Sequence, residues 1–175
     1  MKFINFNYLV IIIYLISSSY SYSIERPDIK NLIIHKDKKK IGNVEFFNFE
    51  GQKVSINKFK NSIIMNFWAT WCAPCREEMP SLNRLKSLKE FKYVDIIPIN
   101  IGGESSQKSK KFFEDLKIDN LKIFSGSGQK ISEKFKIRGL PTTILIDKNG
   151  YEFARIIGYI DFENKSFLDW LINNL

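Results

Sequence analysis

The only two cysteines of the chain, Cys72 and Cys75, lie in the stretch Trp71-Cys72-Ala73-Pro74-Cys75. Two thiols at this spacing can close into a small, reversible disulfide, which indicates redox chemistry. Apolar residues recur at helical spacing after the pair, so Cys72 is expected at the start of a helix. Because unpaired backbone N–H groups at a helix start favour a thiolate, Cys72 is the expected nucleophile.

Two other uses of a Cys-x-x-Cys pair are a zinc site and a structural clip. A tetrahedral zinc site needs about four N or S ligands, and this chain adds one histidine, His35, in a lysine-rich stretch. A clip this short would restrain the unfolded chain little, and no further cysteine exists for a disulfide framework. We therefore favour redox-active thiols that need no metal and no other cofactor.

Residues 1–23 have the layout of a secretory signal peptide. They begin with Lys2, continue through the apolar run 8–16, and end in small residues such as Ser21-Tyr22-Ser23. The alternative is an uncleaved membrane anchor, but a span needs about 20 apolar residues, and Asn5 and Asn7 interrupt the run. In either case the rest of the chain is expected to be exported to a compartment where disulfides persist.

The formal net charge of +8 raises the question of a nucleic-acid partner. The lysines are scattered, however, and their densest cluster falls in residues 24–40, which have no sustained periodicity and are predicted to be a linker. Export would also separate the chain from nucleic acid. We therefore predict no nucleic-acid partner, and a solvated surface with at most weak attraction to anionic lipid.

Residues 41–175 are long enough for one domain with a real core. Strand-like segments are expected at 44–49, 53–56, 63–68, 94–101, 121–124, 142–147 and 151–158. Helical spacing is found at 72–90, after 105, at 129–135 and from about 161. The first two strands flank Glu50-Gly51, which suggests a hairpin that leads into the domain. The alternation predicts an α/β fold, with a central mixed sheet flanked by helices.

Two motifs resemble those of the thioredoxin superfamily: NFWATWCAPCREEMP at residues 66–80 and GLPTTILID at residues 139–147. In combination they look like the TlpA/ResA branch of exported, membrane-linked thiol-disulfide oxidoreductases, and the resemblance extends from about residue 41 to residue 175. It implies a thioredoxin-like fold. It also implies that Cys72 is the exposed attacking thiol and Cys75 the buried resolving thiol.

The same resemblance implies several supporting residues. Pro141 corresponds to the family's cis-proline, which lies across from the disulfide, and the neighbouring segment with Leu140 and Thr142 is expected to pair with an extended substrate. Glu78 corresponds to a buried active-site acid, although its spacing alone favours an ordinary surface glutamate. Thioredoxin has an aspartate where this chain has Asn66, and asparagine cannot titrate. Acid–base work is therefore expected from Glu78 or from water.

Two residues of the cysteine motif itself have expected supporting roles. Pro74 lacks an N–H and has a fixed φ, which suits the first turn of a helix and limits the motif's freedom. Trp71 is expected at an exposed rim of the site.

The resemblance implies a reductase of disulfides in client proteins, with apocytochrome c as one example, at the bacterial periplasm or the outer face of the inner membrane. It also implies a membrane thiol reductant of the DsbD/CcdA type. Relatives devoted to cytochrome c maturation often carry Glu-Thr where this chain has Thr142-Thr143, so the client stays open. A thiol oxidase, a peroxidase and a membrane-tethered thioredoxin-fold binding module are the alternatives.

Overall fold

The computed structural model describes residues 26–175. The prediction of a signal peptide at residues 1–23 falls outside the described residues. Within residues 26–175, no helix has the length and apolar character needed to cross a membrane.

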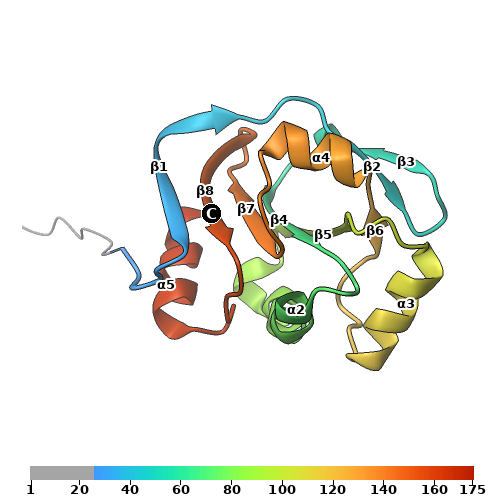
Figure 1. Ribbon diagram of the computed structural model, residues 1–175. Helices are drawn as coiled ribbons and strands as arrows, with labels where there is room; N and C mark the ends of the chain where they lie inside the picture. Colours follow the sequence, from blue (N-terminus) through green and yellow to red (C-terminus); the bar gives the residue numbers. More distant parts are fainter. Residues whose placement is uncertain (1–25) are drawn as a thin grey trace, which may run out of the picture.

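One mixed sheet forms the centre of the molecule (Figure 1), with the strand order β1-β8-β7-β4-β5-β6-β2-β3. β4 runs parallel to β5, and β5 parallel to β6, whereas the other neighbours are antiparallel. The strands are β1 (Leu32–Lys40), β2 (Glu45–Asn48), β3 (Lys53–Ser55), β4 (Ser62–Trp68), β5 (Val94–Asn100), β6 (Phe124–Ser125), β7 (Thr142–Ile146) and β8 (Tyr151–Ile157). The predicted α/β fold with a mixed sheet and a β2–β3 hairpin is confirmed.

Helices cover both faces of this sheet, and each face has its own apolar core. One core packs beneath α2 (Ala73–Ser87), α3 (Ser106–Asp115) and α5 (Lys165–Asn174). The other packs beneath α4 (Gly128–Phe135) and the β2–β3 region. Two short 3₁₀ turns, η1 (Ile56–Lys58) and η2 (Lys89–Phe91), precede β4 and β5.

The two-residue period of the strands decides which side chains reach the α2 face. β4 is buried along its whole length, and its side chains alternate between the core beneath α2, where Ile64 packs, and the core beneath α4, where Met65 packs. Asn66 therefore faces α2. Thr143 of β7 is the register partner of Asn66 and lies on the same face.

Pro98 lies inside β5, where a proline costs a ladder hydrogen bond. It is opposite Asn66 of β4, but β6 begins to pair with β5 only at Ile99. The strand therefore has a neighbour on one side only at this residue, which explains how it accommodates the proline.

Residues 32–40 form the edge strand β1, so the predicted linker over residues 24–40 is wrong for this part of the chain. β1 pairs antiparallel with β8, and Leu32 is buried in the core beneath α2. The sheet thus begins at Leu32 and not near Ile41. An edge strand exposes most of its side chains and tolerates lysines well, which is why its composition resembled that of a linker.

Candidate active site

Cys72 and Cys75 are joined by a disulfide at the start of α2. Cys72 is the N-cap residue, and its Sγ accepts a hydrogen bond from the backbone N–H of Cys75 at 3.3 Å. Cys75 is fully buried, whereas Cys72 keeps 5% of its surface exposed. The exposure of Cys72 is thus smaller than the resemblance implied. Its place at the helix N-terminus is the one that favours a thiolate after reduction.

The sequence of α2 explains why a helix begins here and how it packs on the sheet. Pro74 lies in the first turn, where its missing N–H has no intrahelical partner to lose. Met79, Leu82 and Leu85 recur at helical spacing and are fully buried against the sheet. Trp71, just before the helix, is 69% exposed, as expected for the rim of the site.

The Leu140–Pro141 peptide bond is cis. Thr142, the next residue, pairs with Phe67 near the end of β4, so Pro141 lies at the same edge of the sheet from which the chain continues to Cys72. The Thr142 hydroxyl donates to the carbonyl of Gly139 at 2.8 Å. Among residues 26–175, the backbone N–H and C=O of Leu140 have no hydrogen-bonding partner.

Glu78 is completely buried beneath the disulfide-bearing turn. Its Oε1 accepts from Asn66 Nδ2 at 2.7 Å, and its Oε2 accepts from the backbone N–H of Ile160 at 3.2 Å. Burial raises the pKa of Glu78 to about 8, although these two hydrogen bonds act in the opposite direction. A carboxyl with this pKa can exchange a proton near neutral pH.

Asn66 connects this carboxyl to a second strand. Its Nδ2 also donates to the Thr143 hydroxyl at 2.9 Å, so β4, β7 and α2 meet in one buried polar group. The Oδ1 of Asn66 is buried and has no hydrogen-bonding partner among residues 26–175. Asn66 replaces the titratable aspartate of thioredoxin with a fixed donor to Glu78.

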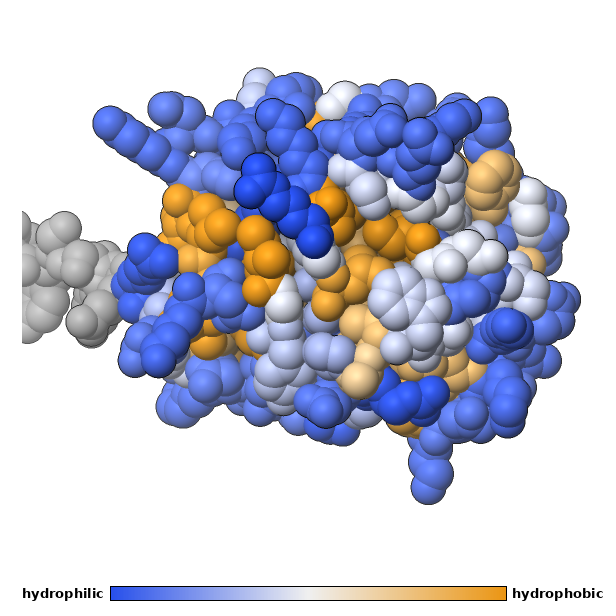
Figure 2. Space-filling view, viewed as in Figure 1, coloured by the Kyte–Doolittle hydropathy of each residue, from blue (hydrophilic) through white to orange (hydrophobic). Residues whose placement is uncertain are grey.

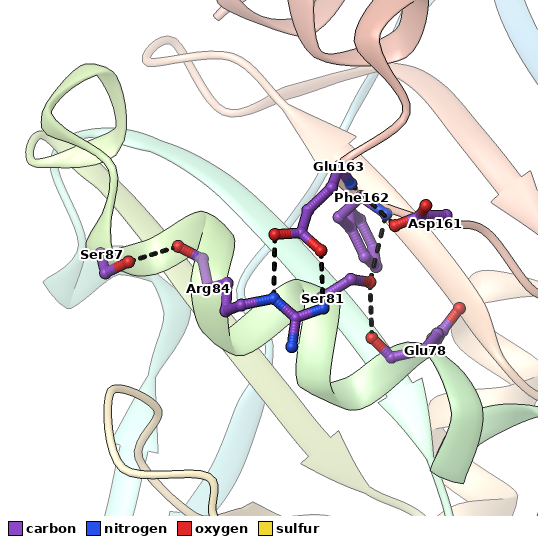
Figure 3. Close-up of polar contacts among 7 residues, drawn as sticks. All are labelled: Glu78, Ser81, Arg84, Ser87, Asp161, Phe162 and Glu163. Atoms are coloured by element: carbon purple, nitrogen blue, oxygen red, sulfur yellow. Dashed lines mark hydrogen bonds and ion pairs between the residues drawn. The ribbon is translucent and has the colours of Figure 1, made fainter.

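Residues 158–162, the first part of the segment between β8 and α5, cross α2 and are called the strap below. Ser81 Oγ donates to the carbonyl of Glu78 at 2.8 Å and accepts from the backbone N–H of Phe162 at 3.2 Å (Figure 3). Next to the strap, Arg84 forms a two-pronged ion pair with Glu163 (Figure 3). The strap is therefore fixed to the helix that carries the cysteines.

Two hydrogen-bonding groups at the site could not be identified from the sequence. The first is the Ile160 N–H, which no side-chain pattern reveals because the donor is backbone. The second is Glu104, whose Oε1 accepts from the backbone N–H of Thr70 at 3.1 Å and also from the Thr70 hydroxyl. Glu104 thus holds the loop that leads to Cys72.

Apolar side chains gather on the face shown in Figure 2, over β1, β8 and β7 and next to α4, with hydrophilic side chains between and around them. Ile157 and Tyr159, at the β8 end of the strap, are among the exposed large hydrophobic residues. In residues 26–175 no three metal-ligating side chains gather in one place.

Known proteins share both the sequence and the fold. Residues 38–151 match the AhpC/TSA family. The chain is 31% identical over 154 residues to the thiol-disulfide oxidoreductase ResA of Bacillus thuringiensis (strain Al Hakam), which covers 85% of this chain and 86% of the relative.

Two solved structures show the same fold. StoA from Bacillus subtilis superposes with a TM-score of 0.61 at 23% identity, covering 74% of this chain and 96% of that chain. A secreted thiol-disulfide isomerase from Corynebacterium glutamicum gives a TM-score of 0.70 at 21% identity, covering 85% and 94%. The chain, with its disulfide at the start of α2, belongs to the AhpC/TSA family and within it to the ResA-like thiol-disulfide oxidoreductases.

Proposed function

We propose that this thiol-disulfide oxidoreductase is an exported reductase of disulfides in envelope proteins. One observation carries the proposal: the Cys72–Cys75 disulfide lies at the N-terminus of α2, with a fully buried carboxyl, Glu78, one helical turn further on. This arrangement supplies an activated sulfur, a resolving sulfur and a proton acceptor in one place.

The first step is the attack of the Cys72 thiolate on a client disulfide. A Cys72–client sulfur bond forms, the client S–S bond breaks, and one client sulfur leaves as a thiolate. The N–H and C=O of Leu140, which have no partner within residues 26–175, can pair with an extended client backbone in the way an added strand pairs with a sheet edge. Exposed Trp71 adds apolar contact at the rim.

The second step releases the client. Cys75 loses its proton and attacks Cys72 Sγ, the Cys72–Cys75 bond forms, and the second client sulfur leaves as a thiolate. Two electrons have then passed from the enzyme to the client. The Glu78 carboxylate accepts the Cys75 proton in this step and holds it in the oxidised protein, where burial raises the pKa of Glu78 to about 8; Glu78 gives the proton back to Cys75 when the disulfide is reduced again.

The compartment, client and electron donor form the outer part of the proposal. The leader supports export to the bacterial periplasm or the outer face of the inner membrane. We propose apocytochrome c as the first client to test and a membrane thiol reductant of the DsbD/CcdA type as the electron donor. No metal or cofactor enters the scheme.

A trapping experiment tests the thiol mechanism. In a Cys75→Ser variant the second step cannot occur, so clients are expected to accumulate in cells as mixed disulfides through Cys72. The double variant Cys72→Ser/Cys75→Ser is the control and should trap nothing. If the single variant also traps nothing, the thioredoxin-fold binding module replaces the enzyme as the better reading.

A redox titration tests the direction of electron flow. Equilibration of the cysteine pair with glutathione buffers gives its reduction potential, and a reductase is expected near the value of thioredoxin, about −270 mV. A value near that of DsbA, about −120 mV, would establish a thiol oxidase and overturn the reductase proposal.

A further inference from the structure

Asn31 is the residue directly before β1, in the part of the chain that was predicted to be a linker. There the chain runs beside β8 and α5 (Figure 1). The backbone carbonyl of Asn31 accepts from the N–H of Ile157 at 3.2 Å. Asn31 thereby lies against the beginning of the strap.

The side-chain amide of Asn31 binds two backbone carbonyls, that of Ile157 at the end of β8 and that of Tyr159 in the strap. Nδ2 donates to the carbonyl of Tyr159 at 2.8 Å and to the carbonyl of Ile157 at 3.3 Å. An amide nitrogen has two hydrogens, so one side chain can serve both acceptors. Gly158 lies between them with φ +94°, a backbone conformation that side chains disfavour.

Each of these carbonyls belongs to a peptide unit whose N–H points into the redox site. The carbonyl of Ile157 shares its peptide unit with the N–H of Gly158, which donates to the Pro141 carbonyl at 2.8 Å. The carbonyl of Tyr159 shares its peptide unit with the N–H of Ile160, which donates to Glu78 Oε2 at 3.2 Å. In both peptide units, therefore, Asn31 binds the carbonyl while the N–H binds a residue of the redox site.

We propose that Asn31 is a positioning residue of the disulfide-exchange centre, which aligns the two peptide units that bind the cis-proline carbonyl and the buried Glu78 carboxyl. The inference rests on the proposed function and deepens it. Hydrogen bonds in a chain polarise one another, so donation by Asn31 to the Tyr159 carbonyl makes the Ile160 N–H a better donor to Glu78.

The expected consequence is a change in the proton affinity of Glu78. Burial raises the pKa of Glu78, and the Ile160 N–H lowers it, so weakening that donor raises the pKa further. The other titratable groups that act in this region are Tyr159, Asp161 and Glu77, as seen in the raised pKa of the Tyr159 phenol, caused by burial and by these carboxylates. None of them is changed by a substitution at Asn31.

The direct test is a carbon-13 NMR titration of the Glu78 carboxyl in the oxidised full chain. For Asn31→Ala the pKa of Glu78 is expected to rise by about half a unit, as the partial loss of one hydrogen bond predicts. The matched control is Asn173→Ala, which removes a side-chain donor to the Asp169 carbonyl in α5. The control should leave the titration of Glu78 unchanged.

Amide exchange and a second variant complete the test. The Gly158 and Ile160 amides should exchange several-fold faster in Asn31→Ala, and Asn31→Ser, which can donate to only one carbonyl, should shift Glu78 in the same direction by a smaller amount. If the amides lose protection while Glu78 titrates as in the wild type, Asn31 is only structural and the inference is overturned. The titration needs no client, so a failed trapping experiment with Cys75→Ser would reject the proposed function separately.

Discussion

At the scale of single residues, the buried carboxyl of Glu78 dominates the behaviour of the site. It is fully buried, and within residues 26–175 its hydrogen-bond donors are both neutral: Asn66 Nδ2 and the Ile160 N–H. No cation compensates for its desolvation in this set, so its neutral form is favoured and its pKa rises from 4.5 to about 8. The folded protein therefore holds a proton that the unfolded chain releases.

This difference predicts a pH dependence of stability. Between about pH 4.5 and 8 the unfolded state ionises Glu78 and the folded state does not, so the free energy of unfolding falls as pH rises, by on the order of 5 kcal/mol. Glu78→Gln should lose this part of the slope and be more stable than the wild type at pH 8. Urea unfolding of the oxidised proteins measures both slopes.

Glu77→Gln, at the exposed neighbouring position, is the control for that experiment and should keep the slope of the wild type. Equal slopes in the wild type and Glu78→Gln would mean that Glu78 titrates normally. In that case the assignment of Glu78 as the proton acceptor would lose its basis.

At the scale of elements, a buried ionic cluster joins β1, β8 and α4. Glu152 is 2% exposed, and its Oε1 contacts His35 Nε2 of β1 at 2.6 Å and Arg155 Nε at 2.5 Å. Arg155 also donates to the carbonyl of Phe135, the last residue of α4. Burial alone would raise the pKa of Glu152, but the bonds from Arg155 and His35 outweigh burial and lower it.

Removing the charge of Glu152 should therefore be costly. Glu152→Gln leaves the mostly buried Arg155 guanidinium without its counter-ion, and we expect a loss of about 3 kcal/mol in the free energy of unfolding at pH 7. Glu45→Gln breaks the exposed pair with Lys53 and should cost less than about 1 kcal/mol. Chemical denaturation distinguishes the two, and equal small losses would show that the cluster does not stabilise β1.

The elements also show what sequence can predict. β4 and α2 were predictable because β4 is buried on both faces and reads as one apolar run, and because α2 places Met79, Leu82 and Leu85 at helical spacing. β1 was not, since its pattern is mostly exposed and only pairing with β8 reveals it. Burial of Glu78 followed only from resemblance, and backbone donors such as the Ile160 N–H leave no sequence signal.

At the scale of the whole molecule, the chain from Asn31 to His35 contacts the strap, the core beneath α2 and the ionic cluster. Asn31 binds the strap, Leu32 fills the core beneath α2, and His35 completes the cluster around Glu152. The strap in turn binds Glu78 and Pro141. Residues 31–35 are thus connected to the stability of the domain and, through the strap, to Glu78 and Pro141.

Two shortened chains test this view of the domain boundary. A chain that begins at residue 26 keeps every described contact and should unfold cooperatively. A chain that begins at residue 41 loses the burial of Leu32, about 2 kcal/mol, and leaves Glu152 without one of its hydrogen-bonding partners, at a similar cost. Its melting temperature should fall by about 10 °C or more. Equal melting temperatures would place the boundary at residue 41, whereas the expected drop would show that the domain begins with β1.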